Sequence, residues 1–109
     1  MIDVKTRFIA VSTYHVAAEN FAKVTEAATR LMQNEISALD GFCEGAVVTD
    51  EAKTRMLLVT QWSSKHDWAQ AFWEPRIGDV VAGFVEHATK YEVQTFEPLT
   101  IVRKPGSNK

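Results

Sequence analysis

The stretch RMLLVTQWSSKHDWAQAF, residues 55–72, contains the clearest change of structural pattern in the chain. Residues 56–59 form an apolar run that is too short for a typical helix and rich in strand-forming residues. The run continues to Trp62, and the next two residues, Ser63 and Ser64, offer a hydroxyl that can cap a helix. The sequence therefore predicts a strand over 55–62 followed directly by a helix.

Three large aromatic side chains are expected to converge at this junction. Trp68 and Phe72 lie four residues apart in the predicted helix and share one of its faces, while Trp62 ends the strand. Large aromatic side chains are usually buried, so the cluster fits a thick part of the core. The wall of an apolar pocket is the alternative, because a buried indole N–H needs a partner and a ligand oxygen can supply it.

The bulk properties are those of one small folded domain. We expect the core of the 109 residues over about residues 7–96, with an edge segment and tail over 97–109. Hydrophobic residues make up 46% and charged residues 24%, and the net charge is −2. Lysines and arginines are scattered, so no nucleic-acid-binding face is expected. No apolar run reaches about 18 residues, so no membrane span is expected.

A cytoplasmic location is expected. Residues 1–7 carry charges where a signal peptide needs an apolar core, and the single Cys43 excludes an intrachain disulfide. The three histidines, His15, His66 and His87, are far apart in the sequence, and Cys43 has no nearby partner. No metal-binding motif is therefore predicted.

The residues before the strand over 55–62 show strand and helix patterns in turn. Residues 7–15 are β-branched and aromatic and predict a strand. From 18 to 39 apolar residues recur at steps of three and four, which predicts one long amphipathic helix. Asp40 and Gly41 should end it, with Gly41 in a left-handed conformation. A second strand is predicted over 42–49, with a bulge at Gly45, and a polar turn over 50–53 joins it to the next strand.

The C-terminal part repeats the sequence of helix and strand. Pro75 interrupts the helix that carries Trp68, and an apolar helical period resumes over 77–88. Residues 90–96 alternate and predict a fourth strand. A short edge strand is expected over 99–102 and a frayed tail over 104–109.

The predicted order, β-α-β-β-α-β, is that of an α+β ferredoxin-like fold, a four-stranded antiparallel sheet with both helices on one face. The strand over 55–62 is apolar on both sides, with Met56 and Leu58 on one and Leu57 and Val59 on the other. An uncovered apolar sheet face is too large a patch for a monomer. We therefore expect a homodimer whose sheets pack face to face.

Ser12 and Tyr14 share one face of the first predicted strand. If this face meets the helices, the two hydroxyls belong to the same cavity as the aromatic cluster. A tyrosine that closes the end of the barrel is the alternative.

The sequence resembles the antibiotic biosynthesis monooxygenase family of dimeric α+β barrels. The matching features are Leu39-Asp40-Gly41-Phe42 at the helix-to-strand turn, the apolar strand that ends in Trp62, Ser64-Lys65 after it, and the Pro75 break. The resemblance covers about residues 7–96. The family includes cofactor-free oxygenases of polycyclic phenols and haem-degrading enzymes.

The resemblance implies positions for the site. The oxygenases have a pocket Trp at the end of the third strand, and Trp62 matches it. Trp68 stands where they have a Tyr and Leu58 where they have an Asn, while Ala82 falls near the place of a helix Arg and Arg76 is the nearest arginine. By the same resemblance, Trp62 faces the helix-side cavity, so Leu57 and Val59 should lie in the dimer interface.

The haem-degrading members resemble this chain in fold but need a histidine near Val81 and an asparagine near Ala10. This sequence has neither.

The implied activity is cofactor-independent monooxygenation of a small phenolic or quinol-type aromatic, in an apolar pocket between sheet and helices. Molecular oxygen would be the co-substrate, with no cofactor or metal. The catalytic candidates are Trp62, Trp68 and Tyr14, and the candidate substrate contacts are Ser12, Leu58, His66, Phe72 and Arg76. The alternative is a protein of the same fold that binds a small aromatic, lipid-like or haem ligand without turnover.

Overall fold

The computed structural model describes residues 7–102 and 104–106. The elements in this part of the chain follow the predicted order, with one additional 3₁₀ turn and with the last helical region divided before Pro75, as predicted. They are β1 (Phe8–Val16), α1 (Ala18–Asn34), the 3₁₀ turn η2 (Ile36–Ala38), β2 (Phe42–Thr49), β3 (Arg55–Trp62), α2 (Lys65–Ala71), α3 (Pro75–His87) and β4 (Ala88–Phe96). The N-terminal residues 1–6, and residues 107–109 of the expected frayed tail, lie outside the described residues, as does Arg103.

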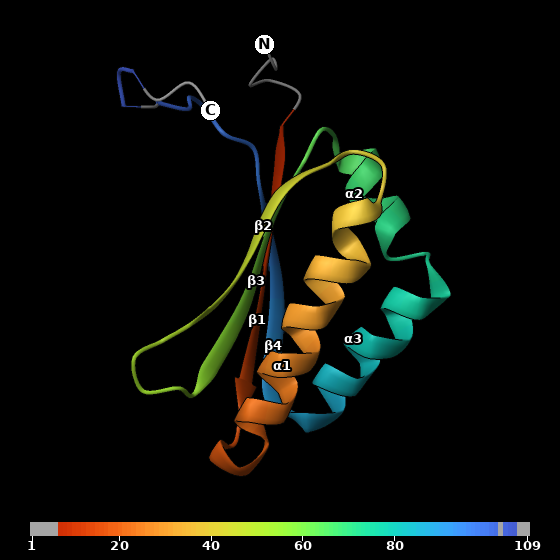
Figure 1. Ribbon diagram of the computed structural model, residues 1–109, viewed down its shortest axis with the longest axis vertical. Coiled ribbons are helices and arrows are strands. Elements are labelled where there is room, and N and C mark those ends of the chain that lie inside the picture. The colour runs from red at the N-terminus through yellow and green to blue at the C-terminus, as the bar shows by residue number, and fades with distance from the viewer. Residues whose placement is uncertain (1–6, 103, 107–109) are drawn as a thin grey trace.

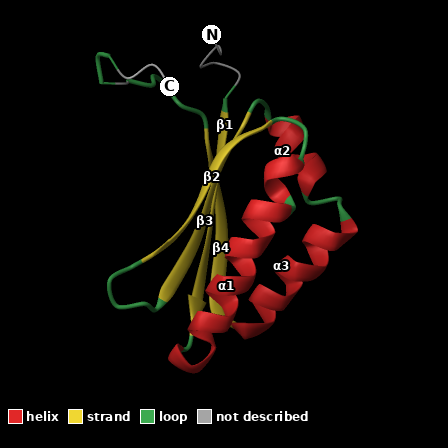
Figure 2. Cartoon of the chain, in the orientation of Figure 1, coloured by secondary structure: helices red, strands yellow, loops and turns green. Residues whose placement is uncertain are grey.

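The four strands form one antiparallel sheet in the order β2-β3-β1-β4. The helices cover one face of this sheet and leave the other open (Figure 1; Figure 2). This arrangement confirms the predicted ferredoxin-like α+β fold. Among the described helices, none combines the length and apolar character needed to cross a membrane.

The two faces of β3 differ in their surroundings. Met56, Leu58, Thr60 and Trp62 are all buried beneath the helices, whereas the residues between them, Leu57, Val59 and Gln61, are only half-buried on the open face. β1 pairs with β3 from Phe8 to His15 and shows the same division, except that Thr13 on the open face is also buried. Trp62 therefore lies on the helix side of the sheet, as the family resemblance implies.

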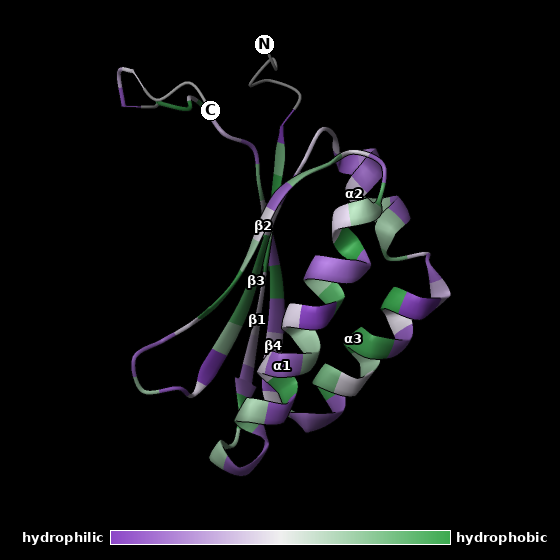
Figure 3. Cartoon of the chain, in the orientation of Figure 1, coloured by the Kyte–Doolittle hydropathy of each residue, from purple (hydrophilic) through white to green (hydrophobic). Residues whose placement is uncertain are grey.

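Helix α1 packs on the sheet through one apolar stripe, Phe21, Val24, Ala28, Leu31 and Met32. Hydrophilic residues alternate with this stripe along the helix ribbon (Figure 3). The helix is shorter than predicted, because it ends at Asn34 and not at Leu39. The Ser37 hydroxyl bonds the Gln33 carbonyl at 2.8 Å, and the chain tightens into η2, which still buries Ile36.

Two predicted details of the strands are wrong. The irregularity in the β2–β3 pairing lies between Phe42 and Glu44, so the bulge falls at Cys43 and not at Gly45. At Gly45 a side chain would press on the Met32 sulfur of α1, so this glycine permits a close approach of helix and strand. Residues 99–102 form no strand, because Pro98 interrupts the chain after β4 and Leu99 is almost fully exposed.

A hydrogen-bonded turn holds helix α2 against the end of β2. The Ser64 hydroxyl caps α2 by accepting the Asp67 N–H at 3.1 Å, as predicted. The Asp67 carboxylate accepts the Ser63 hydroxyl at 2.6 Å and the Ser64 hydroxyl at 3.1 Å, and these bonds hold the pKa of Asp67 below its usual range. The Ser63 N–H donates to the Gly41 carbonyl at 2.8 Å.

Gly41 has the predicted left-handed conformation, with φ of +82°. A Cβ at this position would overlap the Asp67 carboxylate. Glycine is thus required here for two independent reasons, its backbone angle and the space above it.

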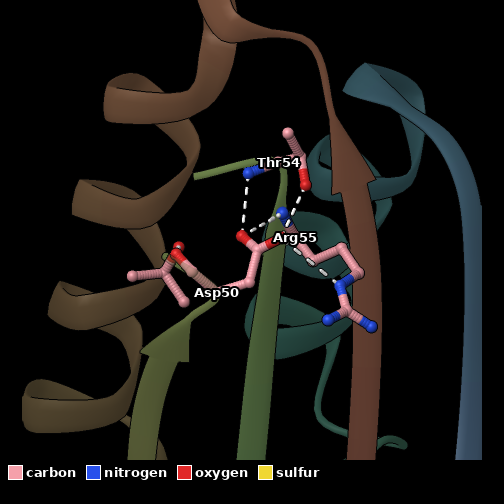
Figure 4. Close-up of polar contacts among 4 residues, drawn as sticks. Asp50, Thr54 and Arg55 are labelled. Carbon is pink, nitrogen blue, oxygen red and sulfur yellow. Dashed lines mark hydrogen bonds and ion pairs between the residues drawn. The ribbon is translucent and has the colours of Figure 1, made fainter. Parts of the chain in front are cut away.

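The β2–β3 turn is organised by one carboxylate (Figure 4). Asp50 accepts the backbone N–H groups of Thr54 and Arg55 at 2.8 and 3.0 Å and the Thr54 hydroxyl at 2.6 Å. The Arg55 guanidinium lies 3.5 Å from the same carboxylate. These contacts, with the Thr54 hydroxyl as the largest cause, hold the pKa of Asp50 far below its usual range.

We predict that the stability contributed by Asp50 depends on pH. Because its folded-state pKa is depressed, this contribution is present above about pH 4, the range of an unfolded aspartate, and is lost as the pH falls through the folded-state pKa. Asp50→Asn should have a lower thermal midpoint than the wild-type protein at pH 7. The difference between the two midpoints should become smaller in acid. Glu51→Gln, in the same turn, is the control and should change little. An Asp50→Asn deficit that is equal at pH 7 and pH 2.5 would contradict the prediction.

We also predict opposite effects of one substitution at two glycines. Gly41→Ala should destabilise the fold by about 1–3 kcal/mol through its backbone angle alone, with the overlap at Asp67 adding to this. Gly83→Ala, in the middle of α3 where a Cβ meets nothing within 4 Å, should stabilise it by about 0.5–1 kcal/mol. Chemical denaturation of both variants measures the difference, and equal effects would contradict it.

Candidate functional site

Two adjoining cavities lie between the sheet and the helices α2 and α3. The larger, which we call the outer pocket, has a volume of about 510 Å³ and is bordered by strand β4. The smaller, which we call the inner cavity, has a volume of about 20 Å³ and lies deeper, against β3. Ser12, Tyr14, Phe72 and Val81 line both, so the two spaces share a wall.

Aromatic side chains form most of the outer pocket. Trp68 of α2 packs between Phe8 and Phe72, with ring centroids 5.2 and 5.3 Å apart. Phe72 and Trp73, which follow α2, are 43% and 78% exposed and form the rim. The opposite wall comes from β4, and its residues are Tyr91 and Val93. The pocket therefore has the apolar, aromatic walls typical of a site for a small apolar molecule.

Tyr14 connects the two cavities from the floor of the site. It is only 1% exposed, stacks on Tyr91 with centroids 5.8 Å apart, and meets the edge of Phe84. Burial raises the pKa of Tyr14, while a hydrogen bond with Ser12 partly offsets this and the nearby Tyr91 adds to it. The Tyr14 phenol is therefore protonated at neutral pH and able to donate a hydrogen bond.

The two tryptophans of the site have indole N–H groups that are buried without a hydrogen-bond partner. Trp62 is 2% exposed, contacts Phe42 edge-on and lines the inner cavity. Trp68 lines the outer pocket. A buried donor without a partner is costly, so each N–H would gain from an acceptor brought within its reach.

The structure brings most of the sequence-predicted residues to these cavities. Ser12, Tyr14 and Phe72 line both, Trp68 lines the outer pocket, and Leu58 and Trp62 line the inner cavity.

His66 and Arg76 are not among the residues that line either cavity. His66 is exposed in the first turn of α2. Arg76 lies at the start of α3 and bonds Glu35 at 2.9 Å, where it lines a separate groove between α1 and α3. Because α2 turns Trp68 toward the sheet, His66, two positions earlier on the same helix, points away from it.

The sequence analysis missed Thr60, Val81, Tyr91 and Val93 as lining residues. The pairing of β1 with β4 places Tyr14 directly opposite Tyr91 and Ser12 opposite Val93. The strand order of a ferredoxin-like sheet was the available signal, because it sets the first and last strands side by side. Alternation of side chains along the last strand then places Tyr91 and Val93 on the same face as Tyr14 and Ser12.

Within the described residues, no group of three or more His, Cys, Asp or Glu side chains is placed to hold a metal ion.

The fold is similar to several solved structures. One is a monooxygenase from the gene ActVA-Orf6 of Streptomyces coelicolor in complex with nanaomycin D, at 20% identity over 94% of this chain and 96% of that chain, with a TM-score of 0.79. Another is a variant of SnoaB, a cofactor-independent oxygenase from Streptomyces nogalater, at 11% identity over 91% and 99%, with a TM-score of 0.80. A third is a conserved protein from Methanosarcina mazei Go1, at 12% identity over 86% and 94%, with a TM-score of 0.79. At these identities the likeness shows the fold alone.

The sequence itself gives the family. No curated protein matches the chain. The model of the family described as antibiotic biosynthesis monooxygenase matches residues 7–82, which is well over half of the chain. The protein therefore belongs to the antibiotic biosynthesis monooxygenase family.

Proposed function

We propose that the protein is a cofactor-independent monooxygenase that acts on a small phenolic or quinol-type aromatic in the outer pocket. The observation that carries this proposal is an aromatic-walled pocket of about 510 Å³ placed over a buried, protonated tyrosine. Family membership supports the reaction class, and SnoaB, which shares the fold, is a cofactor-independent oxygenase.

The chemistry needs only the substrate and dioxygen. A phenolic aromatic with an activated ring CH₂ releases one proton to solvent and binds as the phenolate. It passes an electron to dioxygen and recombines with the superoxide at that carbon to give a peroxide. The peroxide loses the remaining C–H proton as its O–O bond breaks, and the hydroxide that leaves takes up a proton to give water. The overall change converts the CH₂ and O₂ into C=O and H₂O, so no external reductant is consumed. The protein excludes water, orients the aromatic, and stabilises its phenolate by hydrogen bonds.

Tyr14 is the residue best suited to stabilise the phenolate. Its burial keeps the phenol protonated, so it can donate to an oxyanion in a site with little water. Ser12 shares the strand face and positions the Tyr14 hydroxyl through their hydrogen bond.

Oxygen uptake with a panel of anthrones and hydroquinones tests this proposal. We predict protein-dependent uptake, and a fall in kcat/KM of about a hundredfold in Tyr14→Phe, the typical cost of one lost oxyanion donor. Tyr91→Phe is the matched control, because it removes the hydroxyl of a half-exposed tyrosine and keeps the stacked ring. Absence of protein-dependent uptake across the panel would reject the proposed reaction.

A binding protein without turnover is the second candidate. The observation that favours it is that the residues lining the two cavities include no charged side chain, and Leu58 contributes only apolar surface. The lining also contains no imidazole, so it does not fit a histidine-ligated haem, and a titration without a Soret shift would exclude haem. A ligand-induced rise in the thermal midpoint without oxygen consumption would favour this candidate over the enzyme.

We further propose a homodimer formed through the open face of the sheet. This face carries Leu57 and Val59 half-buried without a covering helix, next to the partly exposed Val48. It is also hollowed, with a depression of about 490 Å³ whose lining includes Ile9, Ala46 and Val59. An apolar sheet face of this kind is usually covered by another molecule.

Two substitutions in β3 test the dimer. Val59→Asp should dissociate it, because the new carboxylate would be buried without a partner between the sheets. Trp62→Phe, on the helix side, should remain a dimer with weaker ligand binding or turnover, and Val59→Thr is the isosteric control. Sedimentation measures the outcome. If Trp62→Phe dissociates the dimer and Val59→Asp does not, the assignment of the two faces is reversed.

A further inference from the structure

The inner cavity differs from the outer pocket in size and in lining. Its volume of about 20 Å³ is enough for one molecule of the size of water or dioxygen. Most of its wall is apolar, and the aliphatic half of its lining comes from four elements, through Ile36, Leu58, Ala71, Ile77 and Val81. A wall of this kind suits a small apolar molecule.

The polar groups at this cavity are the Trp62 indole and the hydroxyls of Ser12, Tyr14 and Thr60, and each of them can donate a hydrogen bond. The Trp62 indole N–H is buried without a partner, and an indole nitrogen donates but cannot accept. The Tyr14 hydroxyl is held in its protonated form. The Thr60 hydroxyl is directed at the Ala10 carbonyl, at 3.5 Å. The cavity therefore combines apolar walls with hydrogen-bond donors, a combination suited to a small neutral molecule that becomes an anion.

We propose that the inner cavity is the dioxygen subsite of this protein, separate from the outer pocket that takes the aromatic. The inference rests on the proposed monooxygenase function and names the place of its second substrate. Neutral dioxygen enters the inner cavity. When the deprotonated aromatic transfers one electron, dioxygen becomes superoxide and the aromatic a radical, and the Trp62 N–H then hydrogen-bonds to the superoxide.

The shared wall supports this division of the site. Ser12, Tyr14, Phe72 and Val81 line both spaces, so an aromatic in the outer pocket and a molecule in the inner cavity would contact the same side chains. Tyr14 contacts both spaces from the floor. Electron transfer and the following C–O bond formation both require this proximity.

Helix α2 offers a matched pair of variants. Of the two spaces, Ala71 lines only the inner cavity and Ala69 only the outer pocket. A valine at position 71 therefore fills the inner cavity, and a valine at position 69 narrows the outer pocket. Ala71→Val should exclude dioxygen, raising the KM for dioxygen while leaving the KM for the aromatic unchanged. Ala69→Val should raise the KM for the aromatic and leave that for dioxygen unchanged.

Dioxygen binding can be measured without turnover, because dioxygen is paramagnetic and relaxes nearby nuclei. In the wild-type protein under dioxygen pressure, compared with nitrogen, the indole N–H signal of Trp62 should relax faster than that of the exposed Trp73. The excess at Trp62 should disappear in Ala71→Val and persist in Ala69→Val. Equal relaxation at Trp62 and Trp73 in the wild-type protein overturns the subsite, even if Ala71→Val fails to fold.

The two proposals fail in different ways. Faster relaxation of the Trp62 N–H signal under dioxygen, with no oxygen uptake when any aromatic of the panel is added, supports the cavity as a dioxygen site and overturns the monooxygenase function. Oxygen uptake without a dioxygen effect at Trp62 supports the function and overturns the subsite.

Discussion

The pairing of β1 with β3 is the interaction on which the site depends. Its register sets Ser12 opposite Leu58, Tyr14 opposite Met56 and Ala10 opposite Thr60. Because side chains alternate along a strand, a slip of one residue would turn the whole set to the open face. Both strands lie in the middle of the sheet, so pairing on each side holds this register.

Helix α2 converts this sheet face into a site with two compartments. It is only seven residues long, so packing and its cap must fix it, because short helices are marginal by themselves. The Ser64 cap and the Asp67 contacts with Ser63 tie its first turn to the end of β3, which directs Trp68 toward Phe8. The chain then turns before Pro75, and Phe72 is one of the four residues that line both the inner cavity and the outer pocket.

Local rules predicted most of the fold. The bounds of β2 and β3, the Ser64 cap, the Gly41 conformation and the Pro75 break all follow from patterns within a few residues. Features that depend on distant residues were missed: the bulge at Cys43, the close approach of Met32 to Gly45, and the contribution of Tyr91 to the pocket. Arg76 was expected in the site, but its partner, Glu35, is 41 residues away, and no spacing rule indicates such a contact.

One wall of the outer pocket belongs to a strand with a single neighbour. β4 pairs only with β1 among the described strands, so its outer row of amides is open to solvent. Lys90 and Glu92 place charges along this strand, which discourages it from pairing with other chains. Tyr91 and Val93 also contribute little to the core, being about half exposed. Natural variation at these two positions can therefore reshape the entrance at small cost in stability, which makes β4 the part of the site through which related proteins can diverge in ligand choice.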